Sequence, residues 1–151
     1  MSVPTDKRKP SLVQFITTAQ ELHDFTITRL TRLPGVYKTY IYEPLSDLVN
    51  NVLQSVTIAN GLSKIDEPEY SQRRNLFKRV QADLISMYKY VDFIFEHCNR
   101  TKDGKTIIKE GSRVEWYQLI KTEQNLIAGV LASDKQAYNR RNRLGDSTDG
   151  E

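Results

Sequence analysis

The feature of this sequence that most constrains its fold is a long run in which an apolar residue recurs every three or four positions. The run consists of Leu76, Val80, Leu84, Met87, Val91, Ile94 and Cys98. Because an α-helix has about 3.6 residues per turn, this spacing places all of them on one face that must be buried. Asp66 followed by Glu69 is typical of a helix cap, and Pro68 suits a first turn. We therefore predict one helix that begins near Asp66 and ends near Cys98.

Two earlier helical patterns are bounded by the few prolines and glycines of the chain. The first extends from Ser11, which forms a capping box with Gln14, to Leu33, just before Pro34-Gly35. The second ends at Asn60. Pro44 either begins its regular part or kinks an earlier turn, and we favour an irregular segment through residues 36–43. The inner stripe of this second helix is Leu45, Leu48, Val49, Val52, Val56 and Ala59.

A last helical pattern follows a polar loop at residues 100–111. Ser112 and Glu115 form its capping box, and it continues to Arg143. Gly129 within it predicts the close approach of a neighbouring helix, since glycine lowers helix propensity. In the loop, Ile107 and Ile108 either pack back onto the helices or form a short hairpin. The predicted inner stripe of this helix is Tyr117, Ile120, Gln124, Ile127 and Leu131.

Four helices joined by short connections predict an all-α domain, an antiparallel up-down-up-down four-helix bundle. A chain of 151 residues is long enough for one such domain, over residues 11–143. Residues 1–10 are predicted to be a flexible basic N-terminal segment, and residues 144–151 an acidic flexible tail. No apolar run reaches the length of a membrane span or of a signal sequence, and a single cysteine fits a reducing compartment, so a cytoplasmic location is expected.

The net charge of +3 is modest, but its expected distribution is uneven. In the predicted topology one end has eight basic and four acidic side chains, the other end has twelve and eight, and the middle has two and seven. Basic side chains near helix C-termini can simply complement the helix macrodipole. Four bases in the first turns of the third helix oppose it, so they predict either phosphate contacts or local pairing with Asp66, Glu67 and Glu69. The predicted nucleic-acid-binding residues are Arg73, Arg74, Lys78, Arg79, Arg140, Arg141, Arg143, Arg29, Arg32 and Lys38.

The third helix also has more apolar residues than one inner stripe requires. The surplus either covers the loop at Ile107 and Ile108 or forms a contact with another copy of the chain, and we favour the contact. Trp116 and Tyr117 could stack on a base, but packing in the core or at an interface is the more common role of such residues. The predicted oligomer or partner interface is Phe77, Ile85, Tyr88, Phe95 and Trp116.

The residues that catalysis or metal binding would need are missing. Neither His23 nor His97 follows a glutamate by three positions, as the ligands of metal-binding bundles do. Cys98 falls on the apolar stripe, which predicts a buried inert thiol. No phosphate loop, nucleophile elbow or zinc spacing is present. We expect no enzyme activity, no cofactor and no metal.

The order of these elements resembles a family of four-helix bundle proteins. The family includes the accessory variability proteins of diversity-generating retroelements and proteins encoded in intervening sequences of bacterial 23S ribosomal RNA genes. The residues that support the resemblance are Leu30-Thr31-Arg32-Leu33-Pro34, Tyr37, Tyr40, the segments 45–56 and 90–95, Trp116-Tyr117 and the segment 126–132. The resemblance implies a basic homopentamer that binds RNA or DNA and assists a reverse transcriptase in template-primed cDNA synthesis.

Two functions therefore compete. The first is a non-enzymatic nucleic-acid-binding accessory protein, with RNA favoured as the ligand. The second is a helical protein–protein adaptor or oligomeric scaffold whose third-helix apolar residues bind a partner.

Overall fold

The computed structural model describes the backbone of residues 10–149 and the side chains of residues 14–145. The chain is all-α, as predicted, and no strand occurs in the described part. Its four long helices are α2 (Pro10–Leu30), α3 (Glu43–Asn60), α4 (Glu69–Phe93) and α5 (Glu110–Asp149). The described chain also contains three short helical segments: η1 (Gly35–Tyr37), η2 (Lys38–Tyr42) and η3 (Ile94–Cys98).

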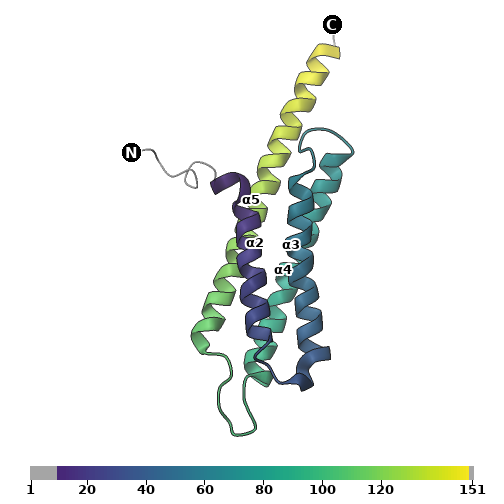
Figure 1. Ribbon diagram of the computed structural model, residues 1–151. Coiled ribbons are helices and arrows are strands. Elements are labelled where there is room, and N and C mark those ends of the chain that lie inside the picture. Colours follow the sequence, from purple (N-terminus) through teal and green to yellow (C-terminus); the bar gives the residue numbers. More distant parts are fainter. Residues whose placement is uncertain (1–9, 150–151) are drawn as a thin grey trace, which may run out of the picture.

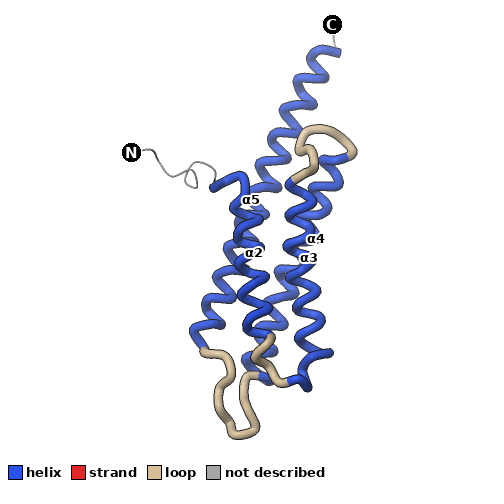
Figure 2. The backbone as a smooth tube through the Cα atoms, viewed as in Figure 1, coloured by secondary structure: helices blue, strands red, loops and turns tan. Residues whose placement is uncertain are grey.

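The four long helices lie side by side, and the loops that join them gather at two ends of the molecule (Figures 1 and 2). We call the end with residues 61–68 and the last turns of α5 the upper end. The lower end contains the connection at residues 31–42 and the loop at residues 99–109. α2 packs against α3 and α5, and α4 also packs against α3 and α5. Each long helix therefore packs against two others: the helices next to it in the sequence, and, for the first and last, each other.

Aromatic pairs mark the contact between α4 and α5 along its length. Tyr70, near the start of α4, stacks on Tyr138 with ring centres 3.9 Å apart. Further along α4, Tyr88 lies 5.5 Å from Tyr117. From the first pair to the second, the residue number therefore rises in α4 and falls in α5.

The core is apolar and includes side chains from all four helices. Within it Trp116 is fully buried, packs against Phe25, and donates a hydrogen bond from Nε1 to Thr26 Oγ1 at 2.9 Å. This bond satisfies two polar groups that would otherwise be buried without a partner. The predicted stripes of α3 and α4 are confirmed apart from the partly buried Leu48 and Leu76.

The stripe predicted for α5 was shifted in register. Ile120 and Ile127 are fully buried as expected, but Tyr117, Gln124 and Leu131 are only partly buried. The buried positions around them are Trp116, Glu123 and Asp134.

The boundaries of three elements differ little from the prediction. The segment before α3 is irregular, and Pro44 lies in the first turn of α3, as we favoured. α4 passes into η3 and reaches Cys98, so the long third pattern is helical throughout. Burial raises the pKa of the Cys98 thiol, in agreement with the inert cysteine that was predicted.

The two ends of α5 were predicted less well. The helix begins at Glu110 rather than at Ser112. It also continues to Asp149, through most of the segment that the sequence predicted to be an acidic tail from residue 144. Figure 1 shows that this last part of α5 extends beyond the other helices. The predicted basic segment at residues 1–9 and the last two residues lie outside the described part.

The loop at residues 99–109 combines the two structures that the sequence left open. Arg100 and Thr106 form an isolated bridge, and Gly104 has a positive φ of 81° at the turn. Ile108 is fully buried, and Asn99 binds its backbone through two hydrogen bonds of 2.8 and 2.6 Å. The loop is therefore a short hairpin-like turn that also packs onto the helices.

Gly129 does not mark a close helix contact. An added Cβ would meet no heavy atom within 4 Å, and the residue is exposed. The prediction of close packing there is wrong. Within the described residues, no helix has both the length and the apolar character that a bilayer crossing requires.

Candidate functional site

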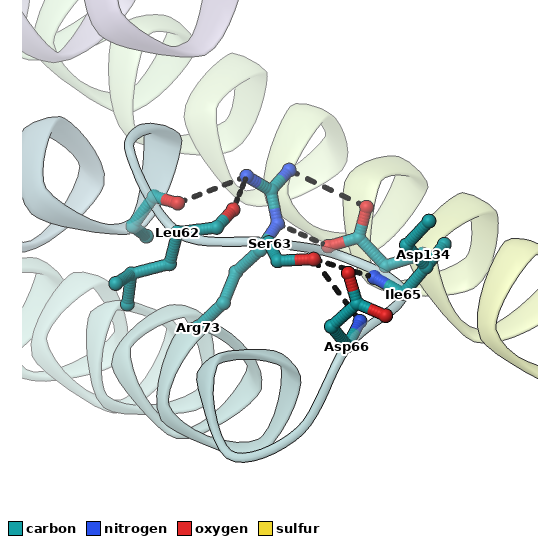
Figure 3. Close-up of polar contacts among 7 residues, drawn as sticks. Leu62, Ser63, Ile65, Asp66, Arg73 and Asp134 are labelled. Carbon is teal, nitrogen blue, oxygen red and sulfur yellow. Dashed lines mark hydrogen bonds and ion pairs between the residues drawn. The ribbon is translucent and has the colours of Figure 1, made fainter.

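The most tightly bound of the predicted site residues is Arg73, which forms a buried ion pair with Asp134 (Figure 3). Arg73 Nε lies 2.6 Å from one oxygen of the Asp134 carboxylate, and Nη2 lies 3.3 Å from the other. The two residues are only 8% and 5% exposed. This is the two-pronged geometry in which a guanidinium binds a carboxylate most strongly.

The third nitrogen of the Arg73 guanidinium binds backbone carbonyls at the C-terminal end of α3. Nη1 donates to the carbonyl oxygens of Ala59 at 2.9 Å and of Leu62 at 3.5 Å. These carbonyls belong to the last turn of the helix and the residues after it, where the regular helical bonds end; the Ala59 carbonyl also accepts the backbone N–H of Leu62 at 3.1 Å. One side chain thus joins α3, the connection to α4, α4 itself and α5.

The connection that Arg73 holds is ordered by local hydrogen bonds. Ser63 Oγ accepts the backbone N–H groups of Ile65 and Asp66 at 3.2 and 3.0 Å (Figure 3). The Glu67 carboxylate accepts the hydroxyl of Ser71 at 2.8 Å and its backbone N–H at 3.4 Å. Glu67 therefore caps the first turn of α4. It does not form the ion pair with the α4 bases that was the alternative prediction.

The prediction that Arg73 binds phosphate is contradicted by this network. Arg73 lies on the same inward face of α4 as Phe77, four residues later, and its guanidinium is 5.0 Å from the Phe77 ring centre. Because its donors already bind a carboxylate and two carbonyls, a phosphate would have to displace buried partners. The role of Arg73 is therefore to stabilise the fold.

The other three predicted bases of α4 are exposed, on two faces of the helix. Arg74 and Lys78 are four residues apart and share one face. Arg79 lies on another, where it lines a shallow groove of about 470 Å³ together with Ile58 and residues of α4. Burial raises the pKa of Asp83, and the charge of Arg79 partly opposes that shift. Arg79 therefore lies close enough to Asp83 to affect its pKa, on a different face of α4 from Arg74 and Lys78.

The predicted bases of α5 are exposed at the upper end. Arg140, Arg141 and Arg143 are joined there by Lys135, and no acidic residue occurs between positions 135 and 145. None of these four bases forms an ion pair with a side chain that the structure describes, and the same holds for Arg74 and Lys78. We call these six residues the basic upper end: Arg74, Lys78, Lys135, Arg140, Arg141 and Arg143.

The last three predicted bases lie at the lower end of the molecule. Arg32 and Lys38 are exposed. Arg29 is half-buried, and its guanidinium lies 3.6 Å from the Phe25 ring centre, a favourable cation–π distance. The ten predicted residues are thus divided between the two ends and do not form one surface.

Two of the five predicted interface residues are instead core residues. Phe77 and Trp116 are fully buried within the chain, so assigning them to an interface was wrong. Phe95 packs edge-on against Trp116, and Tyr88 donates a hydrogen bond to Gln124, so both are partly covered. Ile85 is 56% exposed and is the member of the predicted set that remains open to a partner.

Glu123 was missed by the sequence analysis and is the most unusual residue of the core. It is fully buried, and neither carboxylate oxygen has a hydrogen-bond partner in the described structure. Burial raises its pKa to about 8, so the carboxyl is mostly protonated at neutral pH. A signal existed in the sequence: Trp116, Ile120, Glu123 and Ile127 have the four-three-four spacing of one helix face.

A groove of about 780 Å³ lies at the upper end, between α2, the connection at residues 61–65 and α5. Gly129 and Ser133 line its α5 side. Arg73 and Asp134 also line it. Among the described residues no three His, Cys, Asp or Glu side chains are grouped as a metal site would require.

Comparison of the chain with models of known protein families, with curated proteins and with solved structures found no match. The resemblance to retroelement accessory proteins therefore stays a prediction.

Substitution of Arg73 should destabilise the fold without acting on ligand binding directly. In Arg73→Met, Asp134 is left buried and unpaired, which should cost about 3–5 kcal/mol of unfolding free energy. In the double variant Arg73→Met/Asp134→Leu the loss should be smaller, because no charge is left unpaired. Urea denaturation measures both, with Arg74→Met as the exposed control. A stability within 1 kcal/mol of wild type for Arg73→Met would contradict the structural role.

Glu123 should make stability depend on pH. Its pKa is about 8 in the folded protein and near 4.5 in the unfolded chain, so the folded form binds the extra proton between these values. The free energy of unfolding should therefore fall with rising pH over this interval, by about 1.4 kcal/mol per unit from this group, and stay level above it. Urea titrations at several pH values should show this slope in the wild type and in the exposed control Glu115→Gln. The slope should be missing in Glu123→Gln, and identical slopes in all three proteins would refute the assignment.

Proposed function

We propose that this chain is a non-enzymatic protein that binds nucleic acid through its basic upper end. The observation behind the proposal is that six exposed bases gather where α4 begins and α5 ends, with Lys135, Arg140, Arg141 and Arg143 in an acid-free stretch of one helix. Such a group attracts a polyanion by releasing the counterions around its phosphates. Arginine, with its planar fork of donors, suits phosphate contacts well.

The proposal includes the predicted arrangement, an antiparallel up-down-up-down four-helix bundle. The supporting contacts are those between α4 and α5 at Tyr70–Tyr138 and Tyr88–Tyr117, together with the positions of the loops in Figure 1. In this arrangement the start of α4 and the end of α5 share one end of the molecule. Arg74 and Lys78 are thereby placed near the α5 bases.

The helix macrodipole does not account for these charges. Its effect falls off within the first and last turns of a helix. Arg140 and Arg141 would have been cap residues had α5 ended near Arg143, but the helix continues to Asp149. Arg74 and Lys78 lie beyond the first turn of α4, so the macrodipole does not explain their positions either. A ligand with negative charge explains both groups.

The resemblance to retroelement proteins gives the proposal a cellular setting. In that setting the chain holds RNA or DNA for a reverse transcriptase during template-primed cDNA synthesis. A homopentamer would multiply the charge of one subunit into a ring of bases and strengthen long-range attraction.

A second candidate function, that of a protein-binding adaptor, is supported by a separate apolar surface near the lower end. A pocket of about 480 Å³ is lined by Tyr40, Tyr90 and Phe93 with Lys89 and two further residues. Tyr40 is 76% exposed and Phe93 44% exposed, and Ile85 lies on the same helix as Phe93. Exposed apolar groups that lie close together mark binding surfaces more often than isolated ones do.

Removal of the α5 bases should weaken nucleic-acid binding and its dependence on salt. We expect Arg140→Gln/Arg141→Gln/Arg143→Gln to lower the affinity for duplex DNA and to reduce the slope of log affinity against log salt by up to about 2–3, since each positive charge removed from the contact with DNA lowers the slope by about 0.9 at most. Fluorescence anisotropy over a salt series measures both quantities. The matched control is Lys89→Gln/Lys121→Gln, which removes exposed bases from the middle of the molecule.

The outcomes separate the two functions. A triple variant that binds as the wild type does, or a wild type that binds neither DNA nor RNA, would end the nucleic-acid proposal. Loss of binding to a protein partner in Tyr40→Ala/Phe93→Ala, with little effect of salt, would favour the adaptor instead.

A further inference from the structure

We infer, on the basis of the proposed function, that the end of α5 enters the major groove of duplex DNA and contacts base edges there. The residues assigned to this contact are Gln136, Asn139, Arg140 and Arg143. All four are exposed.

The first support is the shape of the element. α5 continues from Tyr138 to Asp149, about 16 Å at 1.5 Å per residue, past its last described contact with α4. Figure 1 shows this part as a single helix that projects from the upper end. A helix with its side chains is about 10–12 Å wide, and the major groove of B-DNA is about 12 Å wide. The projecting helix therefore fits the groove without help from other elements.

The second support is the kind of side chain on one face of this helix. Gln136, Asn139, Arg140 and Arg143 follow the spacing i, i+3, i+4 and i+7, which places them on one side of an α-helix. Glutamine and asparagine are the side chains that bind adenine through two hydrogen bonds, and arginine binds guanine in the same way. Amides also donate to phosphate oxygens, so the argument rests on amides and arginines sharing this one face of the helix.

The third support is the position of the rest of the molecule. The side chains that anchor this part of α5 to the other helices are Asp134, which binds Arg73, and Tyr138, which stacks on Tyr70. At about 100° per residue both anchors lie on the side of α5 opposite to the face of Gln136 and Arg143. The four helices thus hold α5 from behind and leave that face open.

The same geometry favours duplex DNA over RNA. The major groove of an A-form RNA helix is deep and narrow, and side chains cannot read bases in it. Proteins that bind single strands stack the bases on aromatic rings. In residues 135–145 the one aromatic side chain is Tyr138, whose ring is already stacked on Tyr70. Binding through this helix therefore selects the DNA duplex.

The test compares affinity with sequence preference. Selection from a pool of randomised DNA duplexes should enrich a preferred sequence with the wild-type protein. Gln136→Ala/Asn139→Ala should lose about 30-fold or more of the preference for that sequence over unrelated duplex, because two base contacts are removed and each discriminates by about 5-fold or more. Its affinity for unrelated duplex and its salt slope should stay unchanged, since no charge is altered. The matched control is Asn51→Ala/Gln54→Ala, two exposed amides at the same spacing on α3, which should retain the preference.

The results distinguish this inference from the proposed function. Equal affinity for DNA duplex, RNA duplex and single strands, with no enriched sequence, would overturn the major-groove contact and leave nucleic-acid binding intact. A preferred sequence that persists in Gln136→Ala/Asn139→Ala would also overturn it. Absence of binding to every nucleic acid would overturn both proposals.

Discussion

The upper end of this molecule depends on one buried ion pair, that between Arg73 and Asp134. Charges are costly to bury unless each finds its partner, and here the guanidinium binds both carboxylate oxygens and two backbone carbonyls. The pair ties α4 to α5 and closes the end of α3 at the same time. It holds the start of α4 beside α5 near residue 134, one turn before the Tyr70–Tyr138 stack, after which α5 extends past the other helices. The buried Arg73–Asp134 pair therefore helps to position the exposed bases of the upper end.

The all-α fold could be predicted from the sequence because apolar periodicity of three and four residues is a strong signal in long helices. The candidate site was predicted less well, since a charge pattern does not reveal which side of a helix faces inward. Arg73 and Arg74 are neighbours in the sequence, yet one is buried and the other exposed. The same one-residue shift of register hid Trp116 and Glu123, whose places in the predicted stripe were given to Tyr117 and Gln124. The end of α5 was missed because Gly145 and several acids suggest a tail, whereas the helix continues to Asp149.

Glu123 and the basic upper end show two ways in which charge is handled in this chain. In the core, a carboxyl without partners keeps its proton, so no net charge is buried near neutral pH. At the upper end, bases are left in solvent without ion pairs to described side chains, on a helix that extends past its neighbours. A projecting helix of this length is marginally stable by itself, because most helical stability in proteins comes from packing. A ligand that surrounds it would stabilise it, which links the exposed charge to the shape of the element.

The central claim is that nucleic acid is bound by the projecting end of α5 and not by Arg73 or the lower end. Hydrogen–deuterium exchange of the whole chain, with and without duplex DNA, tests this most directly. We expect slower exchange on binding in residues 136–145 and in α4 around Arg74 and Lys78. Exchange at residues 31–42 and 99–109 should not change. Protection that appears at the lower end, or around Tyr40 and Phe93, with α5 unaffected, would contradict the account.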